Sequence, residues 1–201
     1  MALDQTAEIQ METAKTKETI PFWLAVSITV MFILPLGLYF GQYSLPLWVA
    51  FIVWAEYFAL GANLGTIKTI IPAYTAGAFW GVCMILLYTW LATFMTGASV
   101  YPMYIALFVG VSVMVYVMKY FKVFQTGSLP YFNGLSMLLA VYFVGAHPTF
   151  TTNAYVLVLL SGAYALAGGY LGWFIGWFNV TITFPRPIAP KPAASTRVRG
   201  F

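Results

Sequence analysis

Six long apolar stretches, separated by short polar connections, follow one another along the chain. A helix that spans the hydrocarbon core of a bilayer needs about 20 predominantly apolar residues, and each stretch is close to this length. The pattern therefore predicts an all-α integral membrane protein with six transmembrane helices. The predicted spans are residues 21–41, 45–62, 69–95, 100–118, 129–146 and 153–180.

A polar segment flanks the predicted transmembrane domain, residues 21–180, at either end. Residues 1–20 contain four of the five acidic residues, and a cleavable signal peptide would instead begin with a basic region followed by an apolar one. We therefore expect a polar cytoplasmic tail and a retained first helix. Residues 181–201 are rich in proline and basic residues, so we expect an extended cytoplasmic tail there.

The basic residues distinguish the two sides of the membrane. With six spans, all nine Lys and Arg residues lie on one side, and the three connections on the other side contain none. Cytoplasmic loops are the loops enriched in Lys and Arg, so we expect both termini to be cytoplasmic. A model with five or seven helices would scatter the basic residues over both sides.

The two halves of the chain share a weak internal similarity. Ser44-Leu45-Pro46 opens the second predicted helix and Ser128-Leu129-Pro130 opens the fifth. At the same spacing of 84 residues, Gly61-Ala62 corresponds to Gly145-Ala146. These matches favour an inverted 3+3 repeat, an arrangement in which transporters place their solute path between the halves. The alternative is that both motifs are common helix-end sequences.

Composition limits the possible function classes. The chain is 62% hydrophobic and 7% charged, whereas soluble domains carry about 25% charged residues, so a soluble domain is excluded. Nine scattered basic residues form no stripe for nucleic acid. We identified no catalytic set, metal-ligand cluster or phosphate-binding glycine loop. We therefore expect a protein that is not an enzyme and has no cofactor.

Small residues recur at four-residue spacing in the third and sixth predicted helices. They include Gly77 and Gly81 in the third helix and Gly168, Gly172 and Gly176 in the sixth. Lipid provides no hydrophobic force between helices, so small residues that permit close backbone approach mark the contacts. We expect these two helices to form an interior pair or to contact a neighbouring subunit.

Three polar residues are candidates for a solute pathway or a partner contact. Glu56 is the one acidic residue outside the N-terminal tail, about ten residues into its helix and close to the expected midplane. Intramembrane acids are costly and often functional, although a structural hydrogen bond would explain Glu56 equally well. Asn133 could cross-link helices near the inner side. His147 could sense external pH, but an ordinary loop histidine is the simpler interpretation.

Several short segments are similar to a known family. They are Trp48–Phe51, Tyr57–Ala59 with Lys68, Leu129–Gly145, and the glycine-rich residues 168–177. Over about residues 25–178, the chain resembles a domain-of-unknown-function family of small bacterial inner-membrane proteins. The resemblance implies a six-helix protein of the bacterial cytoplasmic membrane with no established activity. Glu56 does not belong to the pattern of that family, which weakens any inference of a shared mechanism.

Two hypotheses about function follow. The first is an oligomeric channel or transporter that passes a small solute, based on the repeat, the glycine faces and the intramembrane carboxyl group. The second is a non-catalytic accessory subunit of a larger membrane enzyme complex, such as an oxidoreductase or a monooxygenase. The expected partners are therefore the lipid bilayer and either further copies of this chain or unrelated membrane subunits, but no nucleic acid.

Overall fold

The computed structural model describes residues 19–39, 47–95, 100–148 and 150–184, and every regular element within these ranges is a helix. Most of the two predicted tails, as well as Ser44-Leu45-Pro46, lies outside the described residues. The helices are α2 (Phe22–Tyr39), α3 (Leu47–Ala59), η2 (Leu64–Thr66), α4 (Ile67–Phe94), α5 (Tyr101–Met118), α6 (Lys122–Thr126), α7 (Ser128–Val144) and α8 (Ala154–Thr183).

Each predicted span contains one apolar helix, but these helices differ in length. Among the described residues, three helical segments are long and apolar enough to cross a membrane: residues 64–94, α5 and α8. The other three, in α2, α3 and α7, are apolar but shorter. The chain is therefore all-helical in its described part, and its apolar helices are compatible with a membrane protein.

Helix α3 ends earlier than its apolar sequence predicts. Gly61 and Ala62 both have positive φ angles, of 101° and 50°, and such a left-handed conformation terminates a helix. The amides of Gly61 and Ala62 donate to the carbonyls of Phe58 and Tyr57, which caps the last turn. Helix α7 ends with the same hydrogen-bond pattern at Gly145, whose φ angle is 72°. The two Gly-Ala pairs therefore have the same structural role.

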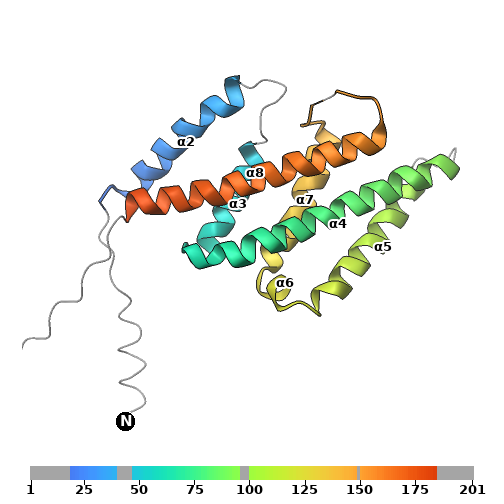
Figure 1. The fold of residues 1–201 in the computed structure, drawn as a ribbon, viewed down its shortest axis with the longest axis horizontal. Helices are drawn as coiled ribbons and strands as arrows, with labels where there is room; N and C mark the ends of the chain where they lie inside the picture. Colours follow the sequence, from blue (N-terminus) through green and yellow to red (C-terminus); the bar gives the residue numbers. More distant parts are fainter. Residues whose placement is uncertain (1–18, 40–46, 96–99, 149, 185–201) are drawn as a thin grey trace, which may run out of the picture.

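The two long helices α4 and α8 run side by side in opposite directions through the middle of the molecule (Figure 1). Helix α7 packs on α4, and α3 packs on α8. Helix α5 lies along α4 at one edge, and α2 lies along α8 at the other. Each long helix therefore supports the short middle helix from the other half of the chain. The main core contains Val49, Val53 and Tyr57 of α3, Ile70, Tyr74 and Ile85 of α4, Leu138 and Val141 of α7, and Val158 and Ala165 of α8.

The predicted glycine faces mediate these contacts. A Cβ on Gly77 would collide with the backbone carbonyl of Tyr131 in α7, and a Cβ on Gly172 would collide with the carbonyl of Ala50 in α3. Gly81 and Gly176 lie against side chains of the same two helices, and Gly168 is buried. The two faces thus contact α7 and α3 rather than each other. A neighbouring face of α8, with Gly169, packs against the ring of Tyr74 in α4.

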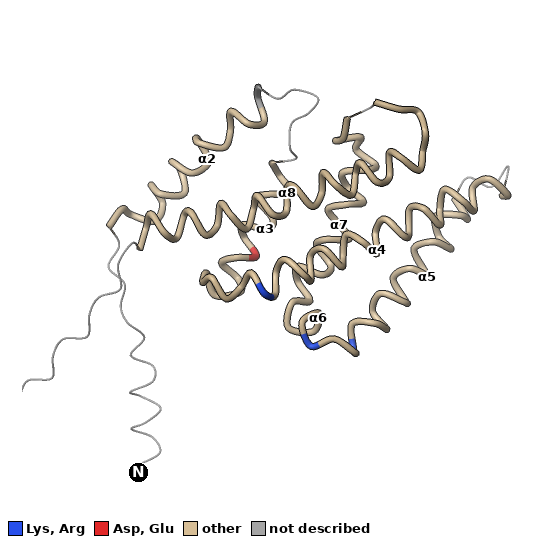
Figure 2. Tube along the Cα trace, in the orientation of Figure 1, with Lys and Arg blue, Asp and Glu red and all other residues tan. Residues whose placement is uncertain are grey.

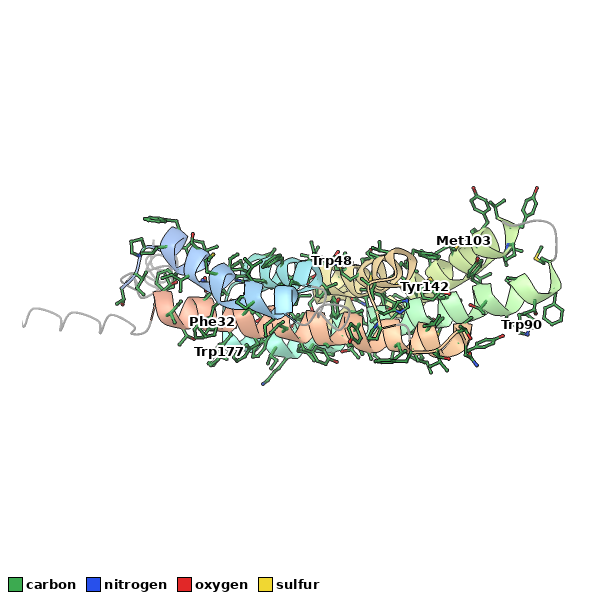
Figure 3. All side chains as sticks on the ribbon, turned by 90° about the horizontal axis from the view of Figure 1, so that it is seen from above. Phe32, Trp48, Trp90, Met103, Tyr142 and Trp177 are labelled. Carbon is green, nitrogen blue, oxygen red and sulfur yellow. The ribbon has the colours of Figure 1, made fainter. Side chains whose placement is uncertain are left out.

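The molecule is a flat slab (Figure 3), and many of its large apolar side chains are exposed, among them Phe32 and Trp90. These two side chains are 79% and 51% exposed. Large apolar areas on a protein surface are normally covered by lipid or by another protein. The outer surface therefore fits a bilayer better than water.

Candidate functional site

The candidate site begins with Glu56, which lies in the last turn of α3 and is only 2% exposed. The sequence placed this residue near the middle of a longer helix. Because α3 ends at Ala59, Glu56 lies about 4.5 Å in axial rise from the end of the helix. It is therefore closer to the turn between α3 and α4 than the sequence indicated.

Asn133 is the partner of Glu56. It lies in the second turn of α7, and its Nδ2 donates to Oε1 of Glu56 over 2.6 Å. The next residue, Gly134, places the α7 backbone directly against the carbonyl of Tyr74 in α4. This close contact positions Asn133 next to α3. The structure thus brings together two of the three predicted polar residues, across the two halves of the chain.

The second carboxyl oxygen of Glu56 has no hydrogen-bond partner among the described residues. Oε2 is buried, and the bond to Asn133 is the one polar contact that the described residues give this carboxyl group. Lys68 is exposed at the start of α4 and is not paired with Glu56. A buried carboxyl oxygen without a donor is costly, so a proton or a ligand that brings its own hydrogen-bond donor or positive charge would stabilise this atom.

His147 lies far from this pair. It follows α7, at the opposite end of that helix from Asn133, with Nδ1 3.3 Å from the carbonyl oxygen of Pro148. Its ring stacks with that of Tyr142 at a centroid distance of 6.4 Å. The structure therefore does not join His147 to Glu56 and Asn133.

A polar pocket of about 250 Å³ lies beyond Glu56, at the turn between α3 and α4. Leu60 lines this pocket and lies one helical turn after Glu56, to whose backbone carbonyl its amide donates. The lining residues are Leu60, Asn63, Gly65, Thr66, Thr69 and Thr126. In the described part of the chain, no three potential metal-ligating residues among His, Cys, Asp and Glu lie together.

Sequence reasoning missed a second buried amide. Asn179 of α8 is fully buried, and its Nδ2 donates to Oγ1 of Thr29 in α2 over 3.0 Å. Its Oδ1 has no partner in the part of the chain that the structure describes. The signal that could have revealed this contact is an amide within an apolar span, because such groups commonly hydrogen-bond between helices.

A family model matches most of the chain. The family model described as "Protein of unknown function (DUF1097)" matches residues 24–179, from within α2 to within α8. The chain belongs to the DUF1097 family. No curated protein and no solved structure matches the chain. Membership in DUF1097 assigns no activity, so a functional proposal depends on the site itself.

Proposed function

We propose that this member of DUF1097 is a six-helix protein of the bacterial cytoplasmic membrane that forms oligomers and passes a small solute without catalysing a reaction. The observation that carries the proposal is the hydrogen bond between Glu56 of α3 and Asn133 of α7. It joins the short middle helices of the two halves, and inverted-repeat transporters bind their solutes between halves.

The packing of the helices supports an inverted repeat. Helix α7 lies on α4 as α3 lies on α8, and α5 borders α4 as α2 borders α8 (Figure 1). A two-fold rotation that exchanges the two halves would also exchange these contacts. The matching caps at Gly61 and Gly145 support the same correspondence.

The distribution of lysines supports cytoplasmic termini. In Figure 2, the described lysines lie along one side of the molecule, at the start of α4 and at the two ends of the α5–α6 connection. Nζ of Lys119 lies 3.7 Å from the centre of the Tyr116 ring. Basic and aromatic residues of this kind are typical of a membrane interface. The same side includes the turn between α3 and α4.

Cysteine labelling tests this topology. In a Cys83→Ala background, Leu64→Cys and Gln125→Cys probe the side with lysines, and Thr152→Cys probes the opposite side. All three positions are exposed. In intact spheroplasts, a membrane-impermeant maleimide should label Thr152→Cys alone. The other two variants should react only after the membrane is lysed, and labelling of either in intact spheroplasts would contradict the topology.

A flux assay tests solute passage. Purified protein in liposomes should accelerate the entry of at least one small solute among urea, glycerol and acetic acid, measured by stopped-flow light scattering. Asn133→Leu should reduce entry to the rate of empty liposomes, because it removes the contact between α3 and α7. The matched control Asn179→Leu removes the other buried amide and should leave entry intact. Equal entry with wild-type protein and with empty liposomes would contradict the proposal.

The exposed face of α5 favours the second candidate, an accessory subunit of a membrane enzyme complex. Only Pro102, Ala106 and Met114 of this helix are buried, whereas Tyr104 and Phe108 are 68% and 76% exposed. A partner subunit could cover these rings as well as lipid does. Two results together would support this candidate: liposomes containing the protein that admit no solute faster than empty ones, and unrelated subunits that copurify stoichiometrically with the protein from native membranes. Copurification of this chain with itself alone would support the homo-oligomer.

A further inference from the structure

Oε2 of Glu56 combines three properties: it is buried, no described residue donates a hydrogen bond to it, and it belongs to the one acidic residue outside the N-terminal tail. A carboxylate has about four acceptor sites, of which Asn133 occupies one. An ionised carboxylate that accepts a single hydrogen bond is strongly disfavoured inside a membrane protein. A proton on Oε2 removes the charge and leaves the hydrogen bond from Asn133 to Oε1 intact.

No described neighbour supplies a permanent positive charge. Helix α3 packs against α2, α4, α7 and α8, and α3 itself contributes Tyr57. The described side chains of α2 contain no titratable group. The titratable residues on the others are Lys68, Tyr74, Cys83 and Tyr88 of α4, Tyr131 and Tyr142 of α7, and Tyr155, Tyr164 and Tyr170 of α8. Phenols and thiols are uncharged at neutral pH, and Lys68 is exposed.

The two buried tyrosines on α4 and α7 are already engaged. The hydroxyl of Tyr74 donates to the carbonyl of Ala165 over 3.2 Å, and that of Tyr131 donates to the carbonyl of Met114 over 3.1 Å. Neither donates to Oε2, so the site is not a closed hydrogen-bond network. In the arrangement seen here, solvent does not reach Oε2, and a solute would require the helices to move before it could touch the carboxyl group.

We propose that Glu56 is a proton-binding site and that the solute passing between the halves moves together with a proton carried on Oε2. This inference rests on the proposed transport function and specifies its driving force. When the site opens to one side, the carboxylate takes a proton from hydronium and releases water. When it opens to the other side, the carboxylic acid returns the proton to water. Asn133 acts as a positioning residue that holds the carboxyl group between α3 and α7.

Infrared spectroscopy tests proton binding independently of transport. Because Glu56 is the one acid in the apolar part of the chain, its signal can be assigned with one variant. Wild-type protein at neutral pH should show the carbonyl absorption of a protonated carboxyl group that shifts in D₂O, and Glu56→Gln should lose it. This variant keeps an oxygen that accepts from Asn133, so it should still fold. Absorption from the carboxylate alone at neutral pH would overturn the proposal.

Flux measurements in one vesicle preparation test the coupling. Vesicles loaded with a pH-sensitive dye report proton entry, while light scattering reports entry of urea or glycerol, neither of which releases a proton of its own. A wild-type protein should admit protons with the solute and respond to an imposed pH gradient. Glu56→Gln should lose both effects, whereas Asn179→Leu should retain them.

The outcomes separate the two proposals. Solute entry that ignores the pH gradient and moves no protons would overturn the coupling while leaving the transport function standing. Proton entry that depends on Glu56 without entry of any tested solute would support the proton site and count against the small-solute function. Absence of both fluxes would overturn the coupling together with the transport function.

Discussion

Replacing Gly77 by alanine should destabilise the protein by about 1–3 kcal/mol, the usual cost of forcing extra atoms into a packed core. The new methyl group would collide with the carbonyl of Tyr131 and approach the amide nitrogen of Leu135, both in the α7 backbone. A backbone cannot rotate away as a side chain can, so α7 would have to move off α4. The reversible unfolding of purified protein in mixed micelles, at increasing mole fractions of a denaturing detergent, measures this loss.

The control for this prediction is Gly162→Ala, in the other long helix. The nearest atoms to its new methyl group belong to side chains, with Cγ2 of Val82 at 3.0 Å and Cδ1 of Leu138 at 3.9 Å. Alanine also favours a helix by about 1 kcal/mol over glycine, so the control should be close to neutral. If Gly77→Ala were as stable as Gly162→Ala, the close approach of α4 and α7 would be wrong.

Tyr74→Ala should have the largest effect of any single truncation in the core, about 3–5 kcal/mol by analogy with other large aromatic residues. Tyr74 is 1% exposed and fills the space left by Gly169 on α8. Its ring thereby connects α4 to α8, and alanine would leave a cavity between the two long helices. The same unfolding assay should show an earlier transition.

Tyr74→Phe separates packing from hydrogen bonding. It keeps the ring and removes only the hydroxyl that donates to Ala165, so its cost should be about 1 kcal/mol. Equal losses for Tyr74→Ala and Tyr74→Phe would mean that the hydroxyl, rather than the ring, holds the two helices together. The ratio of the two losses therefore tests the packing directly.

The positions of the helices could be predicted because hydropathy depends on neighbours in the sequence. The residue at which α3 ends could not be predicted, because it depends on the left-handed conformation of Gly61 and Ala62. A run of apolar residues does not reveal such a backbone angle. The glycine faces were predicted as contact surfaces. The residues that these faces contact could not be predicted. Gly77 contacts Tyr131 and Gly172 contacts Ala50 because each long helix packs against a helix from the other half of the chain.

The candidate site was predicted in its parts rather than as a pair. Glu56 and Asn133 each stood out as polar residues in apolar segments, yet 77 positions separate them in the sequence. Their contact depends on how α3 and α7 pack against the long helices, which a single sequence does not encode in a local pattern. The contact between Thr29 and Asn179, 150 positions apart, was missed for the same reason.

The crossed packing of the halves has a consequence for biogenesis. If the chain is inserted into a membrane as proposed, α3 enters the membrane before α7 and α8 are synthesised, and these two helices later contact α3. During that interval, Glu56 has neither Asn133 nor the surface of α8 to cover it. The nascent first half would then carry an uncovered acidic side chain until the second half is made. Glu56 is fully covered only when α8 has been added, so we expect chains truncated before α8 to be degraded rather than to accumulate.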